Sequence, residues 1–121
     1  MSSKKTLILG ASNNPQRYSY LALNKLKAYG HHIVAVGKKE SVVNGIDITR
    51  STPAVDDVDT ITLYLNPGNQ LPYYDYILSL KPKRIIFNPG TENPELVSLA
   101  KKAGISTVEG CTLVMLSSNQ Y

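Results

Sequence analysis

The sequence predicts an α/β fold in which helices cover both faces of a mainly parallel, five-stranded sheet. Five short apolar runs recur along the chain, and segments with helical spacing separate most of them. Most of these runs stop at a turn rich in Gly, Asn or Pro. This alternation is typical of three-layer folds with a parallel sheet. The predicted strands are residues 7–9, 33–36, 61–65, 84–87 and 105–108.

The first strand, residues 7–9 with Thr6 at its edge, stops at Gly10 and precedes a predicted helix over residues 17–29. Pro15 is compatible with a first helical turn because that turn needs no N–H from it. Gly30 is suited to cap the end of the helix. Spacings of four, four and three predict an apolar face made of Tyr18, Ala22, Leu26 and Tyr29.

The second strand, residues 33–36, completes a βαβ unit, which is right-handed in nearly all proteins. Residues 40–60 show only a weak periodicity of apolar residues. Asn44-Gly45 lies between apolar residues and indicates a small hairpin or a loop. The acidic run at residues 56–59 indicates a solvated loop or a short helical turn.

The second half of the chain repeats the alternation. The third strand runs into the turn Asn66-Pro67-Gly68-Asn69, and Asn93-Pro94 is suited to begin a helix after the fourth strand. Gly104 precedes the fifth strand. The other expected segments are a helix at 71–80, a helix at 94–103, a strand or short helix at 111–116, and a frayed end at 117–121.

Composition limits the possible functions. A length of 121 residues fits one domain over residues 1–121, and 42% hydrophobic residues suffice for an ordinary core. No apolar stretch approaches the roughly 20 residues of a membrane span, and the start of the chain does not resemble a signal peptide. We therefore expect a cytoplasmic protein. The net charge of +4 comes without a basic stripe, so nucleic-acid binding is not indicated, and the charge equally suits a small polyanion such as a phosphorylated cofactor.

Few residues could bind a metal. Cys111 is the only cysteine, which excludes an internal disulfide and a cysteine-based metal cluster. His31 and His32 are the only histidines, and we expect them to be an exposed surface pair. The sequence shows no pair of nucleophile and base and no cluster of carboxylates near the predicted cleft, so catalysis is not indicated.

The strongest functional signal is the set of turns that follow the predicted strands. In a parallel sheet these turns lie along one edge, and ligands bind there near the switch point. The first turn combines backbone N–H groups with a helix N-terminus, which suits a phosphate. The five turns are Gly10-Ala11-Ser12, Gly37-Lys38, Asn66-Pro67, Asn88-Pro89-Gly90 and Glu109-Gly110-Cys111.

The turns also indicate the class of nucleotide. Of the three glycines in a dinucleotide fingerprint only Gly10 is present, since Ser12 and Pro15 occupy the other places. Lys38 and Lys39 stand where an NAD site would have an acidic residue. This favours a nucleotide with an extra phosphate, such as coenzyme A or NADP. The absence of Gly-Lys-Ser/Thr after the first strand excludes a P-loop.

Together these motifs resemble the small stand-alone CoA-binding domain proteins, which are similar to the N-terminal domain of the succinyl-CoA synthetase alpha subunit. The resemblance extends over about residues 5–116 and rests on the order and spacing of the motifs. It is carried by Gly10-Ala11-Ser12, Arg17-Tyr18-Ser19, Gly30 before a strand that ends in a basic loop, Asn88-Pro89-Gly90-Thr91-Glu92-Asn93, and Gly104-Ile105 leading to Glu109-Gly110-Cys111-Thr112.

The resemblance implies a Rossmann-like fold and a cleft that holds CoA or an acyl-CoA at the strand ends. It places the pyrophosphate at Gly10, Ala11, Ser12 and Asn13, with Arg17 and Ser19 as further phosphate ligands. It places Gly37, Lys38 and Lys39 near the adenosine, Asn66 and Pro67 beside the adenine or pantetheine, and Asn88, Pro89 and Gly90 at the pantetheine end. Many relatives have Asn-Pro where this chain has Gly37-Lys38. The synthetase's phosphohistidine segment and second domain are absent, so its ligase chemistry does not transfer.

Each of these residues also has a purely structural interpretation. The turns could simply end strands, Lys38 and Lys39 could be solvated, Arg17 could pair with a carboxylate, and Cys111 could be a small buried hydrophobe. If Cys111 instead faces the cleft, it could form a mixed disulfide with the CoA thiol. Three hypotheses follow: a non-enzymatic CoA-binding module, an NADP- or nucleotide-dependent enzyme, and a scaffold that has lost its ligand. We expect a small-molecule cofactor as partner and a monomer or weak homodimer.

Overall fold

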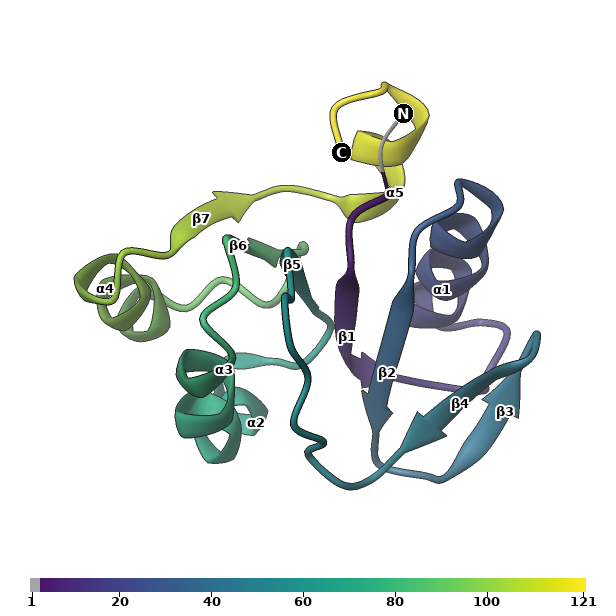
Figure 1. Ribbon diagram of the computed structural model, residues 1–121, viewed down its shortest axis with the longest axis horizontal. Helices are drawn as coiled ribbons and strands as arrows, with labels where there is room; N and C mark the ends of the chain where they lie inside the picture. The colour runs from purple at the N-terminus through teal and green to yellow at the C-terminus, as the bar shows by residue number, and fades with distance from the viewer. Residues whose placement is uncertain (1–2) are drawn as a thin grey trace.

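The computed structural model describes residues 3–121 and contains a seven-stranded sheet with helices on both faces (Figure 1). The strand order is β3-β4-β2-β1-β5-β6-β7, and all neighbouring pairs are parallel except β3 and β4. The strands are β1 (Thr6–Ala11), β2 (Ile33–Gly37), β3 (Ser41–Val43), β4 (Ile46–Thr49), β5 (Thr60–Leu63), β6 (Arg84–Phe87) and β7 (Ser106–Glu109).

The predicted fold class is confirmed, but the count of five strands is wrong. The two additional strands are β3 and β4, which form a hairpin around Asn44-Gly45 and pair with the edge of β2. Asn44 and Gly45 both have positive φ, as tight hairpin turns require. Of the hairpin or loop predicted at this turn, the structure has the hairpin, whose strands were not counted in the sheet because each is only three or four residues long.

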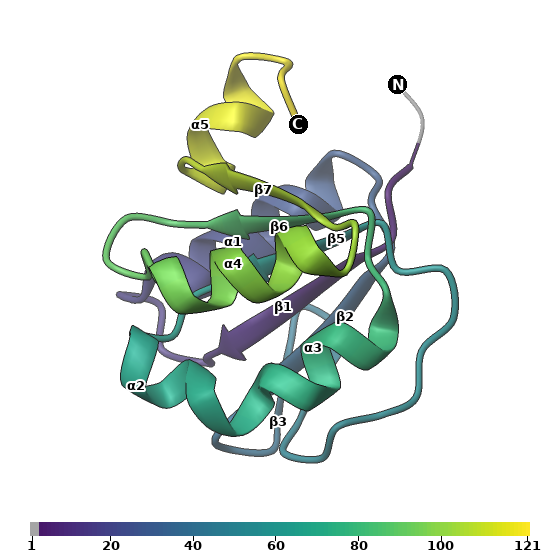
Figure 2. The same cartoon turned by 90° about the vertical axis from the view of Figure 1, so that its left-hand side faces the viewer.

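The helices form two layers. α1 and α5 cover one face of the sheet, whereas α2, α3 and α4 cover the other, which faces the viewer in Figure 2. The helices are α1 (Tyr18–Ala28), α2 (Pro67–Gln70), α3 (Tyr74–Leu80), α4 (Pro94–Lys102) and α5 (Thr112–Ser117), with a 3₁₀ turn at Leu71–Tyr73. None of these helices is long and apolar enough to cross a membrane.

Two cores form because successive side chains of a strand point to opposite faces. On β1, Leu7 and Leu9 join the core beneath α3 and α4, whereas Ile8 joins the core beneath α1 and α5. All three side chains are fully buried. Such buried apolar side chains each contribute roughly 1.5–3 kcal/mol relative to exposure. Apolar packing on both faces of the sheet thus holds the central strand β1 in place, and with it the turn that follows β1.

The apolar face predicted for α1 is displaced. Ala22 and Leu26 are buried as expected, and Ser19 and Leu23 complete the buried face. The other two predicted members are exposed, Tyr18 to 71% and Tyr29, the C-cap residue, to 39%. The spacing rule selected Tyr18 because it treats tyrosine as a core residue. Tyr18 is the first residue of the helix.

The end of the chain also differs from the prediction. Tyr121 was expected in a frayed segment but is only 8% exposed. Its hydroxyl lies 2.5 Å from Thr6 Oγ1, and its ring packs on the Arg84 guanidinium at 4.4 Å. Lys4 Nζ and Arg84 Nη2 both donate to its backbone oxygen. These contacts join the tail to the amino ends of β1 and β6.

His31 shares this environment, so the predicted exposed histidine pair is wrong for His31 and right for His32. His31 is 6% exposed and its ring centroid lies 4.9 Å from that of Tyr121. Its Nδ1 accepts the Lys4 backbone N–H at 3.0 Å, whereas its Nε2 is buried without a hydrogen-bond partner. Burial lowers the pKa of His31, and the nearby charges of Lys4 and Arg84 lower it further, outweighing Asp59.

Candidate ligand-binding cleft

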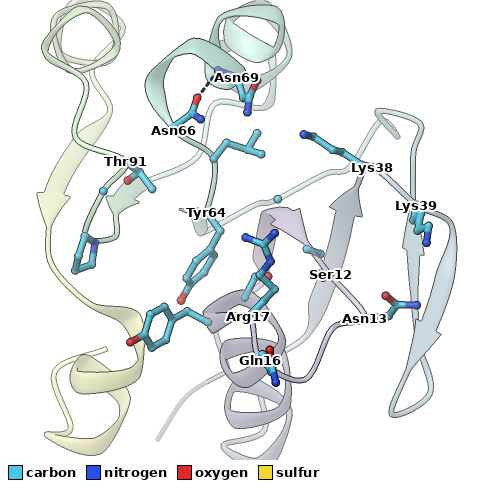
Figure 3. Close-up of a pocket in the computed structure, with 17 residues that line it drawn as sticks. Ser12, Asn13, Gln16, Arg17, Lys38, Lys39, Tyr64, Asn66, Asn69 and Thr91 are labelled. Atoms are coloured by element: carbon cyan, nitrogen blue, oxygen red, sulfur yellow. Dashed lines mark hydrogen bonds between the residues drawn. The ribbon is translucent and has the colours of Figure 1, made fainter.

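A cleft of about 640 Å³ opens at the carboxyl ends of β1, β2, β5 and β6 (Figure 3). The chain passes from β1 to β2 on one side and later returns to β5 on the other side of β1, so the strand order switches at β1. Ligands of open α/β sheets bind at this point. The cleft is lined by Gly10, Ala11, Ser12, Asn13, Gln16, Arg17, Tyr18, Ser19, Lys38, Lys39, Tyr64, Leu65, Asn66, Asn69, Pro89, Gly90 and Thr91.

The turn after β1 forms the floor of the cleft. Gly10 has φ of +99°, and a Cβ at this position would lie 2.9 Å from the carbonyl carbon of Tyr64. The register with β2 shifts between Leu9 and Ala11, and β1 ends at Ala11, which still pairs with Gly37. Two local hydrogen bonds shape the following loop: Asn14 N donates to Ser12 Oγ at 3.0 Å, and Gln16 N donates to Asn14 Oδ1 at 3.0 Å.

The N-terminus of α1 opens into the cleft. Arg17 is the N-cap residue, and no side chain caps the helix or places a negative charge in its first turn. The first backbone N–H groups of a helix lack partners within it and carry its positive partial charge. Tyr18 and Ser19, the first residues of the helix, both line the cleft. A phosphate could therefore replace the missing cap.

Three cationic side chains add to this positive field. Arg17, Lys38 and Lys39 all line the cleft and are all exposed. Figure 3 shows Arg17 beside the turn after β1, with Lys38 and Lys39 on the loop that follows β2. The lining contains no aspartate or glutamate within the described residues 3–121. This charge arrangement suits a polyanion.

The wall after β5 consists of Tyr64, Leu65 and the start of α2. Asn66 caps this short helix, because its Oδ1 accepts the Asn69 N–H at 2.9 Å. The Tyr64 side chain lines the cleft, but its hydroxyl is buried and has no hydrogen-bond partner. Burial strongly raises the pKa of Tyr64, which therefore stays neutral.

The wall after β6 is a loop held at both ends. Asn88, at its start, is 2% exposed, and Nδ2 donates to Thr62 Oγ1 at 2.7 Å and to Leu63 O at 2.8 Å. Its Oδ1 accepts the Thr112 N–H at 2.9 Å. At the other end, Asn93 caps α4. Pro89 and Gly90 lie between these anchors and are exposed to the cleft.

Most of the predicted site residues line this cleft, and four do not. Gly37 packs so closely on β1 that a Cβ would lie 2.2 Å from Ala11 O. Asn88 directs its side chain into the fold, and Pro67 is the exposed first residue of α2. Cys111 is the half-buried N-cap residue of α5. The residues together in the cleft are Gly10, Ala11, Ser12, Asn13, Arg17, Ser19, Lys38, Lys39, Asn66, Pro89 and Gly90.

Six lining residues were not predicted. Tyr64 and Leu65 directly follow β5, and Thr91 is the fourth residue after β6. Extending each predicted turn by a residue or two would have included them. Asn69 is the last residue of a turn that the sequence did indicate. Gln16 and Tyr18 flank Arg17, and no pattern in the sequence distinguishes them. The six are Gln16, Tyr18, Tyr64, Leu65, Asn69 and Thr91.

A smaller cavity of about 190 Å³ adjoins the cleft and shares Gly10, Lys38, Leu65 and Asn69 with it. Its remaining lining residues are Gly37, Pro72 and Tyr73. Glycine, proline and tyrosine offer flat, mostly apolar surfaces, which suit a planar base. Residues 3–121 contain no group of three or more His, Cys, Asp or Glu side chains that could hold a metal ion.

Comparisons with known proteins agree with this geometry. The profile of a family described as CoA binding domain matches residues 4–117. A solved structure of an uncharacterized protein is 55% identical, with full coverage of both chains and a TM-score of 0.97. A conserved hypothetical protein from Pyrococcus furiosus is 27% identical, with 92% of this chain and 97% of that chain covered and a TM-score of 0.81.

A Thermus thermophilus protein shares the fold at 21% identity, with coverage of 98% and 91% of the two chains and a TM-score of 0.87. No curated protein matches the sequence.

Proposed function

The chain belongs to the CoA-binding domain family, and from this premise we propose that it binds coenzyme A or an acyl-CoA without itself catalysing a reaction. The observation that carries the proposal is the charge of the cleft: three cations and an uncapped helix N-terminus, with no carboxylate among the described lining residues. CoA combines a pyrophosphate with a 3′-phosphate, so it needs positive charge at two places.

The residues divide between the parts of such a ligand. Gly10, Ser12 and the N-terminus of α1 are proposed to hold the pyrophosphate, since backbone N–H groups and the helix dipole favour it. Arg17 adds a charge-assisted hydrogen bond. Lys38 and Lys39 are proposed to bind the 3′-phosphate.

The other two parts of the ligand lie on either side of the phosphates. The adjoining cavity beside Gly37 and Tyr73 is proposed to take the adenine. The pantetheine would then extend past Tyr64 towards Pro89 and Gly90, which line the other side of the cleft. Asn66 would border the adenine or the pantetheine.

Cys111 is proposed to be accessible from the pantetheine end, because it is only half-buried and directly precedes Thr112, whose backbone N–H donates to Asn88 at the start of the wall after β6. The Cys111 thiolate would attack CoA disulfide, form a mixed disulfide and release one CoA thiolate. Mass spectrometry after incubation with CoA disulfide tests this step, with Cys111→Ser as the control. An unmodified Cys111 would remove this residue from the site and leave the rest of the proposal intact.

Isothermal titration with CoA, NADP and NAD tests the proposed function. We expect CoA to bind, and Arg17→Ala or Lys38→Ala to weaken it about tenfold, which corresponds to about 1.4 kcal/mol. The matched control is Lys101→Ala, since Lys101 is an exposed lysine on α4 outside the cleft lining. The affinity should also fall as salt rises, because exposed charges are screened.

The same titration separates the alternatives. Binding of NADP in preference to CoA would favour a nucleotide-dependent enzyme, because Lys38 and Lys39 could equally hold a 2′-phosphate. Binding of none of the three would favour a scaffold without this ligand. Either result contradicts the proposed function.

A further inference from the structure

One buried side-chain amide joins two walls of the cleft. Gln70, the last residue of α2, is fully buried. Its Nε2 donates to Leu65 O at 2.8 Å and to Thr91 O at 2.8 Å. Leu65 belongs to the wall after β5 and Thr91 to the wall after β6, and both residues line the cleft.

The orientation of this amide is fixed by its partners. Carbonyl oxygens only accept, so the amide nitrogen must face Leu65 and Thr91. The Gln70 Oε1 accepts from Asn93 Nδ2 at 2.9 Å, which uses the remaining side of the amide. A residue without two donors in this place would leave at least one buried carbonyl unpaired, which costs roughly 1–3 kcal/mol.

The hydrogen bonds continue into α3 and α4. Asn93 Nδ2 also donates to the Tyr74 hydroxyl at 2.8 Å, and that hydroxyl donates to Glu95 Oε1 at 2.9 Å. Asn93 Oδ1 caps α4 by accepting the Leu96 N–H at 3.3 Å. Gln70 therefore connects the cleft walls to two helices whose positions the core already fixes.

Backbone pairing cannot supply this connection. The ladder between β5 and β6 ends at Leu63 and Phe87, so the segments beyond it diverge from the sheet. We propose that Gln70 is a positioning residue that sets the separation of these two walls. The inference rests on the proposed function in one respect: this separation lets the cleft hold the nucleotide and pantetheine parts of one ligand together.

The test compares CoA with adenosine 3′,5′-bisphosphate, which lacks the pantetheine. Gln70→Met keeps the length of the side chain but removes its donors. We expect it to weaken CoA about tenfold and to change the bisphosphate affinity less than twofold, because the bisphosphate would occupy the turn after β1, the lysines after β2 and the cavity beside Tyr73 without reaching the wall after β6. The matched control is Gln120→Met at an exposed position, which should change neither affinity.

A milder variant covers the case in which Gln70→Met does not fold. Asn93→Asp keeps the oxygen that caps α4 and removes the donor to Gln70, so CoA should weaken about threefold with the bisphosphate again unchanged. Equal weakening of both ligands, or unchanged CoA affinity in a folded variant, would overturn the positioning role.

Hydrogen exchange of the unliganded protein decides the positioning role separately from the ligand. Asn93→Asp should speed exchange in residues 64–70 and 89–93 and leave the strands unchanged. Unchanged exchange in these segments, or faster exchange throughout the sheet, would refute the inference. If the wild-type protein binds neither CoA nor the bisphosphate, the proposed function fails, and the exchange result still decides the role of Gln70.

Discussion

Replacing Asn88 by leucine should lower the stability of the protein strongly. Asn88 stands in the turn after β6, where a ligand contact was predicted, yet its side chain makes three hydrogen bonds inside the fold. Leucine has nearly the same size and offers neither donors nor an acceptor. The variant therefore removes the bonds while filling most of the space.

The expected loss follows from those bonds. Leaving Leu63 O and Thr112 N without the side chain that pairs with them costs about 1.5 kcal/mol each, within the roughly 1–3 kcal/mol expected for a buried unpaired group. The Thr62 hydroxyl keeps its hydrogen bond with Thr112 Oγ1 at 2.8 Å, so the loss of its bond to Asn88 adds little to the loss of stability. The total is about 3 kcal/mol, a large part of the roughly 5–15 kcal/mol by which domains are stable. At about 4 °C per kcal/mol for a chain of this length, Tm should fall by about 12 °C.

Thermal unfolding followed by circular dichroism measures this shift. The control is Asn69→Leu, because Asn69 is exposed and only its backbone N–H makes a hydrogen bond there, so its Tm should change by less than about 2 °C. A fall of less than about 3 °C for Asn88→Leu would refute the reasoning. If the variant were stable but no longer bound CoA, Asn88 would instead be a ligand-binding residue, as the sequence predicted.

Two further changes test other parts of the fold. Gly37→Ala should destabilise the protein by roughly 1–3 kcal/mol, because its Cβ would meet Ala11 O at 2.2 Å, and urea titration should show a lower midpoint. Gly68→Ala is the control, since there the nearest atom to a Cβ is 3.6 Å away. Stability should also fall as the pH drops through about 6.5, because the lowered pKa of His31 means that the unfolded chain takes up a proton that the folded protein resists. His31→Phe should flatten this pH dependence of the urea midpoint, and an unchanged slope would show that His31 is not its source.

The sequence predicted most of the residues that line the cleft, but few of the contacts that shape it. The strand-ending turns were visible because apolar runs stop there, and parallel strands bring such turns together without any knowledge of contacts. Arg17 and Lys38 could be identified for this reason. A hairpin or a loop was predicted at Asn44-Gly45, but the strands of the hairpin were too short to be counted as part of the sheet.

Long-range contacts account for what the sequence did not reveal. Asn88 was correctly placed in a turn at the edge of the cleft. The residues around it in the sequence do not show that its side chain bonds to Thr62 and Thr112. Gln70 and Tyr121 were missed for the same reason, since all these partners except Leu65 are 21 or more residues away in the chain. The spacing of residue types along one sequence indicates which residues share a face of a helix or strand. It does not indicate which buried polar side chains from distant segments form hydrogen bonds.

The contact between Tyr121 and Lys4 has a practical consequence. It brings the two ends of the described chain together beside the amino ends of the strands, whereas the cleft lies at the carboxyl ends. A flexible tether attached at either end would therefore leave the cleft facing away from the attachment surface. Immobilised in this way, the protein could be used directly for surface-based binding measurements. A short linker could also join the two ends, with new ends opened at the Asn44-Gly45 turn, and the cleft would be kept intact.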